Sequence, residues 1–445
     1  MNTKFSDLSV TLVPRRAALV AGFDNQLEVL VRVQAPEAPE GAVKKRPPYG
    51  IGLIIDRSGS MSGQPIEEAR RCAAYVVDQL RADDWVSVVE FDNRVKLAAA
   101  AQPKGDGRLL MRAIEDICAG GNTNLHGGWH AGAEDLAKSV LEAGLKRVIL
   151  LSDGCANEGI TETTEIADQC REMAKAGVTT STYGLGRSFN EELMVAMADA
   201  GQGNHYYGET AEDLMEPFRA EFDLLSNLCL KGLKLKATGR TGGSVEMLNH
   251  LTGNAEEGWL LPDLAWGSEA WAVLRVRIPK GAVPSEGIAT DCLNVDLSAT
   301  DLDGSVHLFG SLPLSLSAIN AAAYGAVAED SLVVRRLAEI EAGNLLRSMR
   351  DAANRGDWPE VDRILKAAEE KYADNEWVAG VLVSIRSVAA TRSRERLMKD
   401  SMYASKSFSK RLASKGESLD FSCEIEAPSY LRRKRAPGKE EFGKK

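Results

Sequence analysis

The spacing of the apolar positions changes several times along the chain. Residues 8–14 and 26–34 alternate between apolar and polar side chains, as half-exposed strands do. Residues 47–228 instead alternate between short apolar runs and stretches with apolar side chains at helical spacing. Alternation returns over 229–318, and helical spacing without strand character follows over 319–412. We therefore expect three kinds of structure in one chain.

The central stretch, 47–228, has the pattern of a doubly wound α/β domain. Apolar runs predict buried strands at 50–56 and 146–152. Further strands are expected at 178–185 and 203–207, and a strand pair over 85–100. Helices are expected between them, at 65–82, 107–117, 125–143, 161–176, 190–200 and 210–228. This order of elements predicts a mostly parallel sheet with helices on both faces.

The flanking segments predict a second β-structure around this domain. The strands expected over 229–318 are too few to close an antiparallel sandwich, and the N-terminal strands within 1–46 can supply the rest. Residues 35–48 are a polar, Pro-rich linker, so the α/β domain is expected as an insertion in a β-sandwich.

The C-terminal part of the chain predicts an α-helical domain and a tail. A three-helix packing domain is expected over 319–412, with helices near 319–353, 358–372 and 375–412. Residues 413–445 are rich in Ser, Lys and Arg, which predicts a flexible basic tail.

A D-x-S-x-S motif follows the apolar run at 50–56. It places the carboxylate of Asp56 and the hydroxyls of Ser58 and Ser60 in the turn at the carboxyl end of a buried strand. Ligands of open α/β sheets bind at this edge, and hard oxygen donors suit a small divalent cation. The motif alone is a weak signal, because Asp and Ser are common in ordinary turns.

Two further segments strengthen the signal. Residues 119–128, AGGNTNLHGG, present Thr123 in a Gly-rich loop, and residues 148–154, VILLSDG, form an apolar run that ends in Asp153. In this order the three segments resemble the von Willebrand factor A domain and its metal-ion-dependent adhesion site. The resemblance implies that Asp56, Ser58, Ser60, Thr123 and Asp153 hold Mg²⁺, with Mn²⁺ or Ca²⁺ as alternatives.

The resemblance also implies a function in protein binding. In this family a partner protein supplies an Asp or Glu carboxylate to the open position of the metal. The domain order resembles that of integrin β chains and inter-α-trypsin-inhibitor heavy chains. Bacterial relatives with this layout often serve as adaptors for AAA ATPases or in signalling assemblies. We therefore expect a metal-dependent adaptor or scaffold protein that is not an enzyme. Loops that bind no metal, or a metal that only stiffens the loops, are the alternatives.

The motif favours two other functions less. A metal-dependent hydrolase needs a placed base or a second metal about 3.5–4 Å from the first, and the motif offers two carboxylates without an obvious base. A surface adhesin requires export.

Other candidate residues do not indicate a second site. His126 and His130 lie one helical turn apart but lack the glutamate of H-E-x-x-H, and a structural role is expected for Cys155. Phosphate-loop and G-x-S-x-G motifs are absent from the sequence.

The composition argues against some binding functions and indicates a cellular compartment. The formal net charge of −10 argues against a general nucleic-acid binder. The seven cysteines are scattered without C-x-x-C pairs, which is typical of a reducing compartment. Neither a signal-peptide core nor a run of about 20 apolar residues occurs. We expect a cytoplasmic protein without a membrane span.

Overall fold

The computed structural model describes residues 8–39, 46–139, 141, 144–153, 155–186, 189–208, 210–240, 242–415, 417 and 428–434. The chain divides into two compact units. Among the described residues, unit 1 comprises 8–39, 227–301 and 305–434, and unit 2 comprises 46–226 with 302–304. Unit 2 is therefore an insertion between two segments of unit 1.

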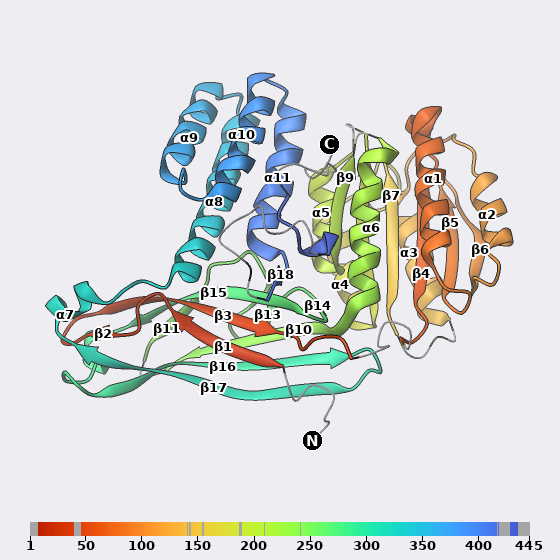
Figure 1. Ribbon diagram of the computed structural model, residues 1–445. Helices are drawn as coiled ribbons and strands as arrows, with labels where there is room; N and C mark the ends of the chain where they lie inside the picture. The colour runs from red at the N-terminus through yellow and green to blue at the C-terminus, as the bar shows by residue number, and fades with distance from the viewer. Residues whose placement is uncertain are drawn as a thin grey trace, which may run out of the picture. The chain divides into compact units, whose positions relative to one another are not determined.

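Unit 2 is built on a six-stranded sheet in the order β6-β5-β4-β7-β8-β9 (Figure 1). Neighbouring strands are parallel except for β5 and β6. The central strand, β4, is buried at every position, which explains why it reads as an uninterrupted apolar run. The strands are β4 (Gly50–Asp56), β5 (Trp85–Phe91), β6 (Val95–Pro103), β7 (Lys146–Ser152), β8 (Val178–Leu185) and β9 (Gln202–Gly208).

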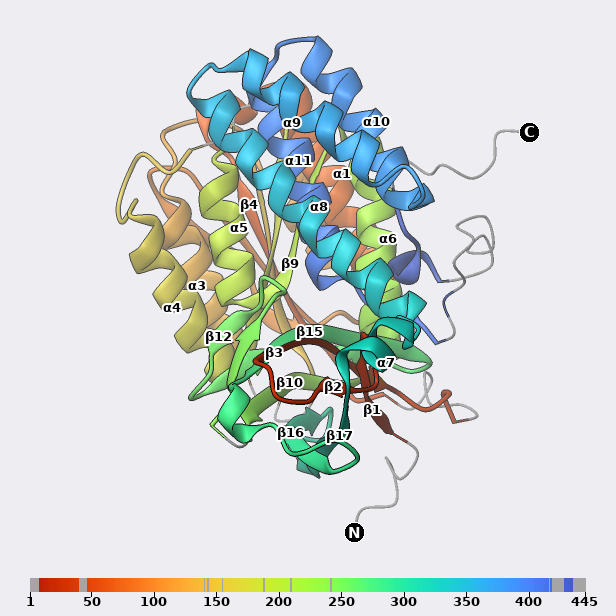
Figure 2. The same ribbon diagram turned by 90° about the vertical axis from the view of Figure 1, so that its left-hand side faces the viewer.

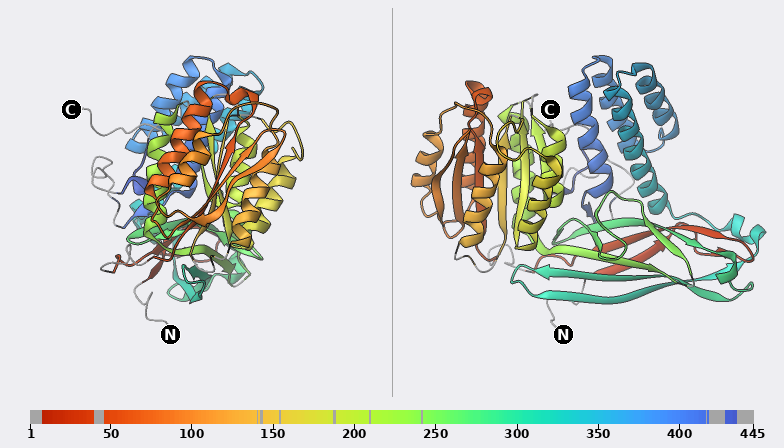
Figure 3. Two further views of the ribbon diagram at one scale, coloured as in Figure 1. Left: turned by 90° about the vertical axis from the view of Figure 1, so that its right-hand side faces the viewer. Right: turned by 180° about the vertical axis from the view of Figure 1, so that it is seen from behind.

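Helices cover both faces of this sheet, α1 and α6 in front in Figure 1 and α3, α4 and α5 behind, as Figure 3 shows. The face behind holds a core in which Trp129 and Met194 from the helices pack against Ile54 and Leu150 from the strands. The helices are α1 (Gln64–Gln79), α2 (Arg108–Glu115), α3 (Leu125–Lys138), α4 (Thr163–Lys175), α5 (Glu191–Ala200) and α6 (Ala211–Asn227). The expected α/β fold is therefore present, with α3 ending earlier than the predicted residue 143.

Unit 1 contains two largely antiparallel sheets. The first has the order β1-β3-β15-β11, with β18 paired to β15; it consists of β1 (Ser9–Pro14), β3 (Asn25–Gln34), β15 (Ser268–Ile278), β11 (Ser244–Met247) and β18 (Ala413–Ser414). The second has the order β12-β13-β10-β16-β17-β2, with β14 paired to β10. It consists of β12 (Thr252–Asn254), β13 (Gly258–Leu260), β10 (Leu228–Gly239), β16 (Ala289–Asp301), β17 (Val306–Ile319), β2 (Leu19–Val20) and β14 (Leu264–Ala265). Pairing of β3 with β15 joins the chain segments that precede and follow the insertion.

Residues 319–412, all of which are described, form five helices rather than the expected three (Figure 2). The predicted helix 375–412 is divided in two, because Arg392 adopts a positive φ of 53° and Ser393 caps a new helix. The helices are α7 (Ala321–Ala326), α8 (Ser331–Asn354), α9 (Trp358–Lys371), α10 (Glu376–Ala390) and α11 (Arg394–Lys410). Val333 and Ile340 of α8 pack on Leu30 and Trp271 of the first sheet.

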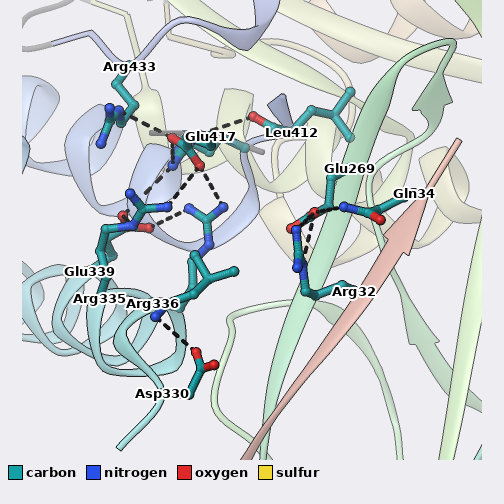
Figure 4. Close-up of polar contacts among 12 residues, drawn as sticks. Arg32, Gln34, Glu269, Asp330, Arg335, Arg336, Glu339, Leu412, Glu417 and Arg433 are labelled. Atoms are coloured by element: carbon teal, nitrogen blue, oxygen red, sulfur yellow. Dashed lines mark hydrogen bonds and ion pairs between the residues drawn. The ribbon is translucent and has the colours of Figure 1, made fainter. Parts of the chain in front are cut away.

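The structure corrects the prediction of a flexible tail from residue 413. Ala413 is fully buried in β18, and the side chains of Glu417 and Arg433 are only 3% and 2% exposed. The basic composition did not predict this packing, in which Arg433 forms an ion pair with Glu417 inside the fold (Figure 4). The rest of the predicted tail, 418–427 and 435–445, lies outside the described residues.

Candidate functional site

The carboxyl ends of β4 and β7 bring the two aspartates of the predicted site together. Asp56 is the last residue of β4, and Asp153 directly follows the last residue of β7. The two strands are parallel neighbours, so their ends lie at the same edge of the sheet. A turn that contains Ser58 and a short 3₁₀ helix, Gly59–Met61, follows β4 and leads into α1.

Asp56 is completely buried, and both of its carboxylate oxygens accept hydrogen bonds. Oδ1 accepts from the backbone N–H of Ser58 at 2.8 Å, and Oδ2 accepts from the hydroxyl of Ser152 at 2.5 Å. These bonds fix the orientation of the carboxylate and the path of the turn that follows it.

A chain of side-chain contacts links the remaining residues of the first motif to Asp153. The hydroxyls of Ser58 and Ser60 lie 3.1 Å apart, and Ser60 Oγ donates to Asp153 Oδ1 at 2.8 Å. Ser58 is buried, whereas Ser60 is exposed. Four of the five predicted residues are therefore gathered in one cluster that is open to solvent on the side of Ser60.

Thr123, the fifth predicted residue, lies in the neighbouring loop that precedes α3. It is buried, its N–H donates to Asn157 Oδ1 at 2.9 Å, and its carbonyl oxygen accepts from the N–H of Asn157 at 3.1 Å. The loop is held beside the first motif, because the N–H of Gly59 donates to the carbonyl of Gly121 at 2.9 Å. Gly121 has a positive φ of 81°, a conformation that favours glycine.

The electrostatics of the cluster fit a cation. Burial raises the pKa of Asp56, and burial also raises the pKa of Asp153 to about 6, helped by the charge of Asp56. Within the described part of the chain neither carboxylate forms an ion pair; Arg57, which lies between the motif residues, pairs with Asp92 at 2.7 Å. Two buried carboxylates beside three hydroxyl-bearing residues are the oxygen donors that Mg²⁺ prefers.

The raised pKa of Asp153 predicts a pH dependence of metal binding. A cation must displace the proton of this carboxyl group, so the affinity for Mn²⁺ should fall as the pH decreases through about 6. Below that pH, we expect a loss of up to about tenfold per pH unit from this one group. Titrations monitored by electron paramagnetic resonance between pH 5 and 8 measure the Mn²⁺ affinity. An affinity that does not change over this pH range would contradict the prediction.

The two histidines noted in the sequence have contacts with α4. His126 Nε2 is 2.8 Å from Gln169 Oε1, and His130 lines a pocket with Glu165, Asp168 and Met173 of α4. Among the described residues no group of three or more His, Cys, Asp or Glu side chains is arranged to hold a metal. Cys155 is exposed in the loop after Asp153.

Two residues that position the cluster were not identified from the sequence. Ser152 supports the Asp56 carboxylate, and Asn157 binds both backbone polar groups of Thr123. The signal for Ser152 was its place directly before Asp153 at the end of an apolar strand. Asn157 belongs to a loop without a periodic pattern, so only the three-dimensional structure reveals its role.

A match to a known family covers this part of the chain. Residues 51–220 match the family model described as the von Willebrand factor type A domain. An uncharacterised protein of Synechocystis sp. is 30% identical over 214 residues, 47% of this chain and 48% of that protein. The inter-alpha-trypsin inhibitor heavy chain H3 of Homo sapiens is 22% identical over 202 residues, 42% of this chain and 22% of that protein. The chain spans about half or less of the length of these curated relatives.

Two solved structures share the fold of most of the chain. The von Willebrand factor type A protein from Catenulispora acidiphila superposes with a TM-score of 0.67 and 17% identity, and covers 86% of this chain and 90% of its own. The ArnB paralog VWA2 from Sulfolobus acidocaldarius gives a TM-score of 0.59 and 19% identity, with 91% and 98% covered. At these identities the similarity concerns the fold alone.

Proposed function

Since residues 51–220 form a von Willebrand factor type A domain, we propose that this protein is a metal-dependent protein-binding module. Asp56, Ser58, Ser60, Thr123 and Asp153 would hold Mg²⁺, and an Asp or Glu of a partner protein would complete its coordination. The bound ion would supply a Lewis-acidic centre that attracts a carboxylate. The observation that carries the proposal is the pair of buried carboxylates without a cationic partner among the described residues.

The surrounding residues favour binding over catalysis. Both oxygens of Asp56 and one oxygen of Asp153 already accept hydrogen bonds from protein groups, which suits fixed orientation more than proton transfer. Ser60 is exposed, so a partner can reach the cluster from solvent. We accordingly propose an adaptor or scaffold rather than an enzyme.

The setting of this function remains a proposal from the sequence. A cytoplasmic location and a partner such as an AAA ATPase or a signalling assembly follow from the cysteine usage and from the resemblance. No helix in the described ranges is long and apolar enough to cross a membrane.

A matched pair of serines tests the proposal. Ser60 and Ser62 are both exposed in the same loop, but only Ser60 contacts Asp153. We expect Ser60→Ala to weaken Mn²⁺ binding by at least about tenfold and Ser62→Ala to leave it unchanged. Water-proton relaxation of the Mn²⁺-loaded protein should decrease on addition of glutarate, which replaces bound water, and not with glutaramide.

Capture of partners supplies the second measurement. Immobilised wild-type protein should retain partners in Mg²⁺ and lose them in EDTA, and Ser60→Ala should retain less in Mg²⁺. Mass spectrometry then identifies the retained proteins. Equal retention with and without the metal, or Mn²⁺ binding that glutarate leaves unaffected, would refute a carboxylate-bridging site.

A further inference from the structure

A third aspartate follows a strand that ends at the edge of the candidate metal site. Asp92 comes directly after β5, which pairs with β4 so that Phe91 lies opposite Asp56 (Figure 1). Strands β5 and β7 flank β4 and are both parallel to it, so Asp92 lies at the same edge of the sheet as Asp56 and Asp153. Asp92 is buried, with 5% of its surface exposed. A third buried carboxylate is therefore present beside the five predicted residues.

Both carboxylate oxygens of Asp92 already have partners in the protein. Oδ1 accepts from the N–H of Arg94 at 2.6 Å, and Oδ2 lies 2.7 Å from Nη2 of Arg57. An arginine stays protonated at any pH of interest, so this ion pair is permanent. A metal ion would have to compete with the guanidinium for Asp92, whereas no cationic side chain among the described residues pairs with Asp56. These contacts favour a supporting role for Asp92 over a role as a further ligand.

Arg57 links Asp92 to the first motif and to the segment that leads into the second loop. It occupies the position after the aspartate of D-x-S-x-S, and its N–H donates to the carbonyl of Phe91 at 2.8 Å. Its Nη1 donates to the carbonyl of Cys118 at 3.0 Å, and its own carbonyl accepts from the N–H of Gly120 at 2.7 Å. One arginine therefore connects the motif, the end of β5 and residues just before the Thr123 loop.

Asp92 also contacts the Thr123 loop directly, on both sides of Thr123. Its carbonyl accepts from the N–H of Asn124 at 2.9 Å. On the other side, a Cβ at Gly121 would lie 2.9 Å from Cγ and from Oδ2 of Asp92, so the backbone of the loop rests against the carboxylate. The position of Thr123 relative to the first motif is therefore set in part by the side chain of Asp92.

The position of this loop matters for the metal more than for the fold. Mg²⁺ requires near-octahedral geometry with oxygen ligands at about 2.0–2.1 Å, so a small displacement of a loop removes its ligand. Asp56 and Asp153 adjoin the ends of strands, whereas Thr123 depends on loop contacts. Among the five predicted residues, Thr123 is therefore the one whose place depends most on Asp92.

We propose that Asp92 is a positioning residue of the metal site. Paired with Arg57, it holds the Thr123 loop against the D-x-S-x-S turn, so that the hydroxyl of Thr123 reaches an ion held by the other ligands. The proposal rests on the proposed function, because it requires Thr123 to be a ligand. Residues that orient ligands without touching the metal typically change its affinity by about 10–100-fold.

A double-mutant cycle on the full-length protein tests this role, with Mn²⁺ affinity measured by electron paramagnetic resonance. Asp92→Ala and Thr123→Ala should each weaken binding by at least about tenfold. In the Asp92→Ala background, Thr123→Ala should add less than about twofold, because the loop no longer presents its hydroxyl. Ser60→Ala should still cost at least about tenfold in that background, because Ser60 belongs to the first motif. A general loss of stability, or the loss of a nearby charge, would not cancel the effect of one ligand alone.

Two further variants serve as controls. Asp83 pairs with Arg81 at 2.7 Å but is 58% exposed, and Asp83→Ala should leave the Mn²⁺ affinity unchanged. Asp92→Asn keeps the volume of the side chain and an oxygen for the N–H of Arg94, and it loses the charge that binds Arg57. It should show the same non-additivity, and it replaces Asp92→Ala in the cycle if circular dichroism shows that the alanine variant does not fold.

The outcomes separate this role from the metal site itself. If neither Thr123→Ala nor Ser60→Ala weakens Mn²⁺ binding to otherwise wild-type protein, the metal site fails and the role of Asp92 fails with it. If both weaken binding, but Thr123→Ala has the same effect with and without Asp92, the metal site stands and the positioning role is overturned. An unchanged Mn²⁺ affinity in both Asp92 variants would also overturn it.

Discussion

Replacement of Asp56 by Asn should abolish measurable Mn²⁺ binding while it stabilises the metal-free protein. The amide keeps the shape of the carboxylate and can bond to Ser58 N–H and to the hydroxyl of Ser152. It lacks the charge that attracts the cation, so we expect a loss of affinity of at least about 100-fold.

The stabilisation follows from the sign of the pKa shift. Burial raises the pKa of Asp56 in the folded state above its value in the unfolded chain, so the ionised form at neutral pH destabilises the metal-free fold. Asn removes this penalty, and each kcal/mol recovered corresponds to a rise of about 2–4 °C in Tm.

An exposed carboxylate of the same unit serves as the control for Asp56. Asp106 pairs with Arg108 at the surface, and Asp106→Asn should change neither Mn²⁺ affinity nor Tm in EDTA noticeably. Mn²⁺ resonance and thermal unfolding in EDTA check both variants. Retained metal binding in Asp56→Asn would exclude this residue as a ligand, and a lower Tm would show that its charge supports the fold.

Replacement of Glu221 by Leu should destabilise unit 2 by about 3–5 kcal/mol, because it leaves the charge of Arg147 buried without compensation. Arg147 Nη1 lies 2.6 Å from Glu221 Oε1, and the two side chains are 3% and 0% exposed. Glu221 also accepts from Ser181 at 2.9 Å and from Tyr206 at 3.0 Å, so α6 is fixed to β7, β8 and β9 through one carboxylate.

A double variant separates the charge effect from lost packing. Arg147→Met combined with Glu221→Leu removes both charges and should recover most of the stability, since apolar replacement of a whole buried pair is often neutral. The surface pair Lys138–Glu134 is the control, and Glu134→Ala should cost at most about 1 kcal/mol. Urea unfolding monitored by circular dichroism measures these changes. Additive destabilisation in the double variant would argue that shape, not charge, makes Glu221 important.

The predictable parts of the fold are those in which burial determines which residues occur in the sequence. The bounds of β4, β7 and β8 were predicted to the residue. β4 and β7 contain apolar runs that end in a polar residue, as expected of strands buried on both faces. β8, VTTSTYGL, is instead rich in β-branched residues, which favour strands. The two helices within 375–410 were predicted as one, since the left-handed conformation of Arg392 leaves no trace in the apolar spacing.

For the described residues after 412, the prediction of a flexible tail was wrong, because composition is an average over a segment. Lys and Arg are frequent after residue 413, yet ion pairs with Arg336, Arg411 and Arg433 hold Glu417 inside the fold. In the loops of the candidate site, some residues were predictable from the sequence and others were not. Asp56 and Asp153 follow apolar runs and were predicted from the sequence. Asn157 and Ser152 act through hydrogen bonds, which the spacing of residues along the chain does not predict.

The pairing of β3 with β15 determines the order in which the chain can fold. Gln34 and Glu269 bond to each other although 235 residues separate them. At synthesis rates of about 5–20 residues per second, the N-terminal hairpin of β1 and β3 waits on the order of ten to fifty seconds for its partner strand. The inserted unit emerges within that interval and can fold before β3 meets β15. During translation, the unpaired edge of β3 is therefore open to pairing with other chains.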